Sequence, residues 1–158
     1  MTTAPIPCEF VRPAATGPAF RVWIPGDPVP KGRPVFFRVG KGVRATTPAK
    51  TFTYENWVRQ CALAEAVKTH DVRPWLATEA PLSISLWIYL APPKDKKRRA
   101  GWPDRRGNGD LDNYVKSVLD GLALAGLFRD DVQVVSLQAI KVWSDEPGAL
   151  VELRAVGA

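Results

Sequence analysis

Apolar residues recur along the chain in two patterns, and each pattern predicts one kind of element. β-branched and aromatic runs bounded by proline or glycine are typical of strands. Such runs span residues 20–24, 35–39, 43–45, 82–90, 132–143 and 149–156. Apolar residues spaced three and four positions apart predict helices. This spacing occurs from 47 to 68, after a Thr-Pro start, and from 110 to 125, before Gly126.

The order of these elements predicts an α+β fold in a single domain. Strands and helices are grouped in a way that favours a mixed β-sheet with two main helices on one face. The run 82–90 becomes wholly apolar toward its end, which is typical of a central strand. Gly40-Lys41-Gly42 predicts a hairpin turn. A turn near 145–148 predicts a second hairpin, which would close the sheet.

Two segments outside this core are expected to be mobile. Residues 1–18 are rich in proline and alanine, so we expect a leader before a domain that spans 19–158. Residues 92–109 carry proline, glycine and many charges, and we expect a flexible basic loop there. The chain has neither a membrane-length apolar run nor a signal-peptide pattern, so the expected location is the cytoplasm.

The predicted helix 110–125 carries apolar side chains on one arc and a row of charges on the other. Asp112, Lys116 and Asp120 follow one another at four-residue intervals, so their side chains can contact along the helix. Asp110 precedes the helix and is placed to cap it. Taken alone, the row is either an ordinary set of surface ion pairs or part of an acidic site.

The charge of the chain bears on this choice. Among 158 residues, 22 Lys and Arg outnumber 16 Asp and Glu; the formal charge of +6 favours a polyanionic partner such as nucleic acid. Asp130 and Asp131, before the next strand, would add carboxylate oxygens of the kind that Mg²⁺ binds. Such a metal can activate water against a phosphodiester while Lys116 stabilises developing charge. An EF-hand calcium loop is excluded, because its glycine and distal glutamate are missing.

Two strings carry a resemblance to a known family. IPGDPVPKGRPVF and, later in the chain, RRGNGDLDNYVKSVLDGLALAGLFRDDVQV resemble the RusA-like Holliday-junction resolvases. The shared features are a D-L-D-N-x-x-K helix start and a D-D pair before a strand, within a match from Phe20 to Leu153. The resemblance implies a homodimeric α+β endonuclease that uses Mg²⁺, or Mn²⁺, to cut the strands of branched DNA, a four-way junction, in pairs.

The same resemblance implies roles for individual side chains. Asp110, Asp112 and Asp131 correspond to the metal-binding acidic residues of the family, and Lys116 to its catalytic lysine. Asp130 and Asp120 are candidates for supporting roles, and the alternative for Asp120 is that it only pairs with Lys116.

Basic residues of the segment 92–109 are candidates for contacts with the DNA backbone. With two residues of the PKGRP motif, the predicted set is Lys31, Arg33, Lys96, Lys97, Arg98, Arg99, Arg105 and Arg106. Trp102 can stack on an unpaired base. The alternatives are a solvated charged loop and, for PKGRP, a tight strand connection. Gly107-Asn108-Gly109 replaces arginines of the family pattern, which bears on DNA affinity and sequence preference rather than on catalysis.

Four other tryptophans fall within predicted strands or a helix. Aromatic side chains at such positions are more often core than base-stacking surfaces, so we expect them in the core. They are Trp23, Trp57, Trp87 and Trp143.

The sequence therefore predicts a metal-dependent, structure-specific endodeoxyribonuclease that resolves Holliday junctions in DNA recombination and repair. Two alternatives remain open: a non-catalytic protein that binds branched DNA, and a nuclease selective for flaps or forks. The second alternative would use the same acidic site, so only a comparison of substrates separates it from a junction resolvase.

Overall fold

The computed structural model describes residues 15–68 and 79–156. In chain order the elements, with η for short 3₁₀ turns, are β1 (Ala15–Pro25), β2 (Val35–Val39), β3 (Gly42–Thr46), α1 (Ala49–Lys68), β4 (Leu82–Leu90), α2 (Lys96–Arg99), η1 (Arg106–Asn108), α3 (Leu111–Leu124), η2 (Asp131–Gln133), β5 (Val134–Trp143) and β6 (Gly148–Val156). Every strand and helix expected from the sequence is present. β1 begins at Ala15, within the predicted leader, whose residues 1–14 lie outside the described part of the chain.

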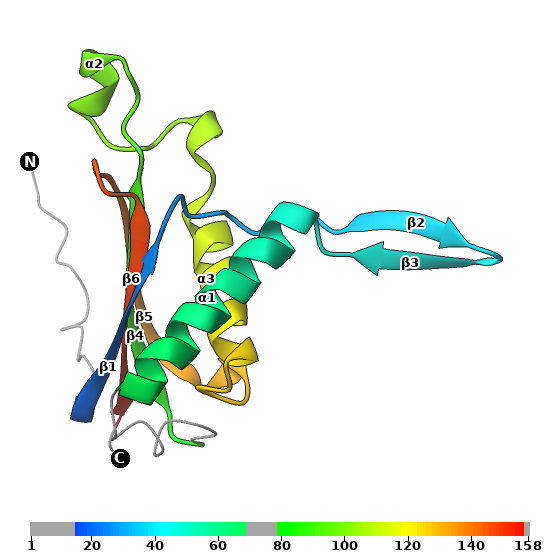
Figure 1. Cartoon of the computed structure of the whole chain (residues 1–158), viewed down its shortest axis with the longest axis horizontal. Helices are drawn as coiled ribbons and strands as arrows, with labels where there is room; N and C mark the ends of the chain where they lie inside the picture. Colours follow the sequence, from blue (N-terminus) through cyan, green and yellow to red (C-terminus); the bar gives the residue numbers. More distant parts are fainter. Residues whose placement is uncertain (1–14, 69–78, 157–158) are drawn as a thin grey trace, which may run out of the picture.

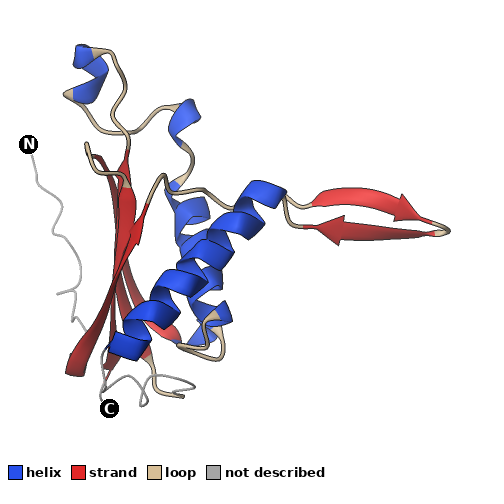
Figure 2. Cartoon of the chain, in the orientation of Figure 1, coloured by secondary structure: helices blue, strands red, loops and turns tan. Residues whose placement is uncertain are grey.

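A four-stranded mixed sheet in the order β1-β6-β4-β5 forms one layer, and α1 and α3 pack together on one of its faces (Figures 1 and 2). β4 pairs with β5 in parallel and with β6 in antiparallel fashion. This arrangement confirms the predicted α+β fold, the mixed sheet and the central position of β4. The segment 92–109, predicted to be a flexible loop, contains the short turns α2 and η1.

The predicted closing hairpin is wrong. β5 and β6 are consecutive in sequence, yet they lie on opposite sides of β4. The reason is that β4, α3 and β5 form a crossover unit, in which a helix returns the chain so that the second strand runs parallel to the first. β6 then takes the other edge of β4, and it also pairs with β1.

The core lies between the sheet and the two helices. Alternate residues of β4 face the helices and are almost fully buried, whereas the residues between them are half-buried on the open face of the sheet. Val58 and Ala62 of α1, with Val118 and Leu122 of α3, have no exposed surface and complete this core. The site described below is built on the outer surface of α3, which this packing holds in place.

Gly121 is the point of closest approach between α1 and α3. A Cβ atom added there would lie 2.6 Å from Val58 Cβ and 2.8 Å from the Glu55 carbonyl oxygen. We therefore expect Gly121→Ala to lower the free energy of unfolding by about 1–3 kcal/mol, because the helices must separate. Urea denaturation measures the change. Gly107→Ala is the control, since a Cβ there meets nothing within 4 Å; equal stability of the two variants would contradict the prediction.

The tryptophans expected in the core are not all buried. Trp23 and Trp57 are 36% and 41% exposed, so the prediction is wrong for them. Trp23 points to the open face of the sheet, where its ring lies 5.7 Å from that of Tyr89. Trp57 lies on the outer side of α1 and donates its Nε1–H to the Pro25 carbonyl. Trp87 and Trp143 are half-buried.

The hairpin β2–β3 stands apart from the sheet and projects from the body as an arm (Figure 1). All ten of its strand residues are exposed. Among the described helices, none has the length and apolar character that crossing a membrane requires.

Candidate active site

The start of α3 presents two carboxylates to solvent. Asp110 occupies the predicted N-cap position of α3, but its side chain makes no capping hydrogen bond. Its Oδ2 instead accepts a long contact of 3.5 Å from Asn113 Nδ2. Asp112 lies exposed in the first turn. Neither carboxylate is committed to holding the helix backbone, and both remain accessible to a ligand.

A chain of alternating charges runs from the surface of α3 toward α1. Lys116 Nζ lies 2.9 Å from Asp131 Oδ2 and 3.0 Å from Asp120 Oδ1. The other oxygen of Asp120 lies 2.7 Å from Lys31 Nζ, and Lys31 also pairs with Glu55, which is buried on α1. We call these five residues the charge chain. It confirms the predicted row on α3 as far as the Lys116–Asp120 contact.

The PKGRP segment reaches the charge chain because its backbone is tied to both helices. The Lys31 amide donates to the Asn113 carbonyl at 2.8 Å, and the Gly32 amide donates to Thr51 Oγ1 at 3.0 Å. Ser117 Oγ donates to the Val29 carbonyl at 2.6 Å. Gly32 is required because a Cβ there would lie 2.8 Å from Pro48 Cγ. The segment is thus a tight connection that also aims the ammonium of Lys31 between α1 and α3.

The charge chain shifts the pKa values of its members. Hydrogen bonds to Asp131 and then Asp120 raise the pKa of Lys116. Burial alone would lower the pKa of Lys31, but its hydrogen bonds to Asp120 and Glu55 outweigh this and raise it. The hydrogen bond from Lys116 lowers the pKa of Asp131, with a second contribution from Asp130. Both lysines are therefore cations at neutral pH, and Lys116 is unsuited to accept a proton.

Asp130 has a structural task. Its carboxylate accepts the Val132 amide at 3.0 Å, while the Gln133 side chain accepts the amide of Asp130. This capping box fixes the turn η2, which presents Asp131 to Lys116. Asp130 therefore holds this turn, and its supporting role in catalysis stays a prediction.

The acidic residues do not form a ready metal cage. Within residues 15–68 and 79–156, no group of three or more His, Cys, Asp or Glu side chains lies close enough to hold an ion. The structure brings Asp131 to Lys116 and Asp120; no contact joins it to Asp110 or Asp112 among the residues described.

Comparison with known proteins gives this surface a context. The family model described as endodeoxyribonuclease RusA matches residues 25–154. The uncharacterized protein YqaN of Bacillus subtilis is 32% identical over 142 residues, which cover 84% of this chain and 94% of that protein.

The chain belongs to the RusA family.

Two further relatives carry that family name. The crossover junction endodeoxyribonuclease RusA of Escherichia coli K12 is 40% identical over 63 residues, 40% of this chain and 52% of that protein. The crossover junction endodeoxyribonuclease of Lactococcus phage r1t is 22% identical over 116 residues, 73% of this chain and 86% of that protein.

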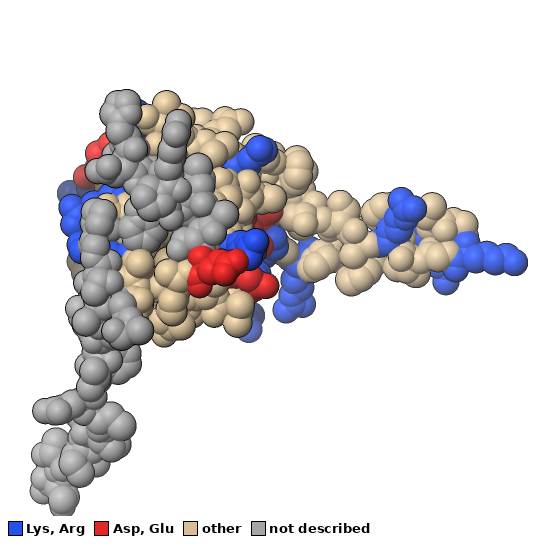
Figure 3. Space-filling model, turned by 90° about the horizontal axis from the view of Figure 1, so that it is seen from below, with Lys and Arg blue, Asp and Glu red and all other residues tan. Residues whose placement is uncertain are grey.

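In this RusA family member, the predicted DNA-binding residues lie in two places. Six of them lie in α2, in η1 or directly before η1, in the segment that precedes α3 (Figure 1), and all six are exposed. Among these, Arg99 pairs with Asp145 at 2.6 Å, and Arg98 lies 3.6 Å from Asp95. Arg33 is exposed near the arm, whereas Lys31 points into the charge chain. Seen from below, Lys and Arg side chains also extend along the arm (Figure 3).

Sequence reasoning missed two residues that shape the site. Glu55 anchors the buried end of the charge chain. Its signal was an acidic residue on the buried side of a helix, beside Tyr54 and Val58, where an unpaired charge would be costly. Lys141 donates to the Gly109 carbonyl at 2.5 Å and fixes the entry to α3. Its signal was a lone lysine inside the apolar run of β5.

Proposed function

We propose that this RusA family member is a metal-dependent endodeoxyribonuclease that resolves Holliday junctions by paired nicking in DNA recombination and repair. The observation that carries the proposal is the position of the Lys116 ammonium. It contacts two carboxylates, and it lies on the same surface of α3 as the exposed Asp110 and Asp112. A fixed cation beside accessible carboxylates suits the cleavage of an anionic phosphodiester. Relatives named as crossover junction endodeoxyribonucleases point to the branched substrate.

Lys116 acts as a fixed positive charge. Because its pKa is raised, it carries a proton throughout the neutral range. Asp131 and Asp120 both restrict where the ammonium can lie in the metal-free protein, and the contact with Asp120, on the same helix, would remain when Asp131 turns to a metal ion. A cation positioned in advance stabilises the extra negative charge that a phosphate develops during displacement, and needs no reorganisation at that moment.

Asp110, Asp112 and Asp131 would hold the metal ion. Their chemistry suits Mg²⁺ or Mn²⁺, since Mg²⁺ is bound through a few carboxylates and keeps several waters. When bound, such an ion polarises the phosphate and makes a coordinated water more acidic. The three carboxylates are not gathered in this structure, and Asp131 must turn from Lys116 to join the others. Asp131 is exposed, so this turn breaks a surface contact and no buried one.

A cleavage assay tests the proposal. Purified protein is incubated with a synthetic four-way junction, a flap and a linear duplex of matched sequence, each with Mg²⁺, Mn²⁺ or a chelator. We expect paired nicks in the junction only when metal is present. Cleavage of the flap at a higher rate would favour the flap-selective alternative. Binding of the junction without any nicking would support the non-catalytic alternative.

The basic residues of α2 and η1 would hold the DNA backbone. They lie just ahead of Asp110 in the chain, so phosphates bound to them lead toward the start of α3. Contacts of this kind position the duplex without reading its sequence. They also make affinity fall steeply as salt rises, because bound DNA releases counterions.

The arm supports a homodimer. Val35, Phe36, Phe37, Val39 and Val43 are each 46–69% exposed, and they occupy both faces of the hairpin. An isolated two-stranded hairpin is marginally stable in water, and apolar side chains on both faces favour burial against another surface. A second copy provides that surface symmetrically, since each arm can pack on the other protomer. Two active sites would then serve the two nicks.

We expect the double substitution Phe36→Ser and Phe37→Ser to convert a dimer into monomers. It removes the two largest apolar side chains of the arm, one from each face. Sedimentation velocity measures the assembly state. Lys41→Ser in the same hairpin is the control and should remain dimeric, since it removes charge and no large apolar surface. A wild-type protein that sediments as a monomer at all attainable concentrations would exclude this dimer.

A further inference from the structure

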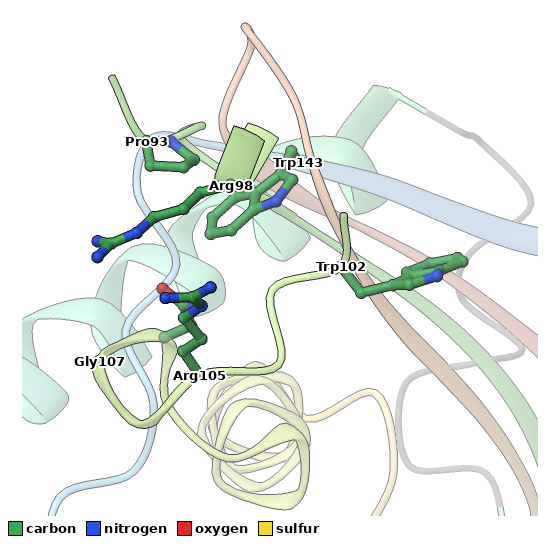
Figure 4. Close-up of a pocket in the computed structure, with 7 residues that line it drawn as sticks. Pro93, Arg98, Trp102, Arg105, Gly107 and Trp143 are labelled. Atoms are coloured by element: carbon green, nitrogen blue, oxygen red, sulfur yellow. The ribbon is translucent and has the colours of Figure 1, made fainter. Parts of the chain in front are cut away.

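A small cavity lies between the basic segment, residues 92–109, and the end of β5. It has a volume of about 150 Å³, and its walls include Pro93, Arg98, Arg105, Asn108 and Trp143. Pro93, Arg98, Arg105 and Trp143 gather around one space, whereas the ring of Trp102 points away from it (Figure 4). We call this cavity the Arg–Trp pocket.

The pocket has the size of one aromatic ring, because a cavity of about 150 Å³ accepts benzene in other proteins. One wall of the cavity is the flat indole of Trp143, and the side chains of Arg98 and Arg105 also line the cavity. Aromatic faces and guanidinium planes are the surfaces on which proteins stack unpaired bases. The sequence placed Trp143 in the core, but the structure leaves it half-buried and lining this cavity.

The pocket also holds hydrogen-bond donors without strong partners. The Arg105 side chain makes no ion pair or hydrogen bond with the part of the chain that is described. Within residues 15–68 and 79–156, the charged group of Arg98 has one partner, Asp95 at 3.6 Å, and both side chains are about half exposed. The Trp143 Nε1–H finds no acceptor among the described residues, but it is itself buried, so the indole offers a ligand its ring rather than this donor. A ligand that brings acceptor atoms next to an aromatic ring matches this lining.

The pocket adjoins the candidate active site. Asn108, in its wall, stands two residues before Asp110, so their Cα atoms are at most about 7.6 Å apart. Trp143 stands two residues after Lys141, whose ammonium donates to the Gly109 carbonyl at 2.5 Å. A group bound in the pocket therefore lies close to the start of α3.

We propose that the Arg–Trp pocket takes one unstacked nucleobase of the DNA strand next to the phosphate that is cut. This inference rests on the proposed function for its substrate. A base that lacks a stacking neighbour leaves the helix at a lower cost than one inside a continuous duplex, and the base pairs at the crossing of a junction held open by the protein lack such a neighbour. Capture of one such base would fix the position of the strand relative to Asp110 and Lys116.

The test compares intact junctions with junctions that lack one base. Abasic sites are placed singly at each position around the crossing, and affinity is measured by fluorescence anisotropy in chelator, where no cleavage occurs. For the wild-type protein, we expect one position at which loss of the base weakens binding about tenfold. In Trp143→Leu and in Arg105→Gln, intact and abasic junctions should bind almost equally. Arg105→Gln keeps the test valid if Trp143→Leu fails to fold, because Arg105 is exposed.

Arg106→Gln is the matched control. It removes one charge from the same segment but does not line the pocket, so it should weaken both junctions equally and keep the ratio between them. The proposal is overturned if no abasic position affects the wild type, or if Arg105→Gln keeps the full ratio. If loss of a base weakens binding but the protein cuts no junction in Mg²⁺, the proposed nuclease activity is refuted and the base pocket is supported. If the protein cuts junctions but loss of a base never weakens binding, the base pocket is refuted and the nuclease activity is supported.

Discussion

Asp112→Asn is expected to lower the rate of junction cleavage in Mg²⁺ by about a thousandfold, because it removes one carboxylate of the proposed metal set. Asparagine keeps the size of the side chain and removes its charge. Asp112 is exposed on the first turn of α3, so the fold should be retained. Single-turnover cleavage of a labelled four-way junction gives the rate, and gel-shift titration in chelator shows whether binding is kept.

The matched control is Asp104→Asn. Asp104 is also an exposed aspartate, within the basic segment 92–109, and its side chain makes no ion pair with the described residues. This variant should cut at the wild-type rate. Wild-type activity in Asp112→Asn would remove Asp112 from the metal set and turn attention to Asp131 and Asp120, the acids already beside Lys116.

The error over β5 and β6 shows what local sequence leaves undetermined. The turn between these strands has the composition of a hairpin turn, and the strands themselves were located correctly. Which neighbour a strand takes depends on how α3 packs across the sheet, and this packing makes β4 and β5 parallel partners. A helix between two strands is compatible with either outcome, so spacing alone could not decide.

In the candidate site too, some contacts could be predicted from the sequence and others could not. Four-residue spacing on one helix placed Lys116 and Asp120 in contact, and the structure has them 3.0 Å apart. The contact between Lys31 and Glu55 joins residues 24 positions apart on different elements, which no local period describes. Helix spacing therefore predicts the outer part of the charge chain, while its buried part depends on how α1, α3 and the PKGRP segment pack.

Replacing Lys116 by methionine tests whether the exposed end of the charge chain takes part in the cleavage reaction. Methionine keeps an unbranched stem and removes the ammonium that Asp131 and Asp120 hold. We expect kcat to fall about a hundredfold to a thousandfold with little change in KM, because the lost interaction stabilises charge that develops only in the transition state. Steady-state cleavage of the junction gives both constants, and Lys116→Arg should recover part of kcat, since it restores a cation.

The comparison with Lys31→Met separates direct from indirect action. Lys31 contacts Asp120 and Glu55 rather than the exposed end of the charge chain, so its loss should reduce kcat less than the loss of Lys116. It should also lower stability, because it leaves the buried Glu55 without its partner. Lys50→Met, on the exposed surface of α1, controls for the loss of one positive charge. If Lys116→Met, Lys31→Met and Lys50→Met cut the junction at the same rate, Lys116 only forms an ordinary surface ion pair. Its fixed positive charge then has no part in the reaction.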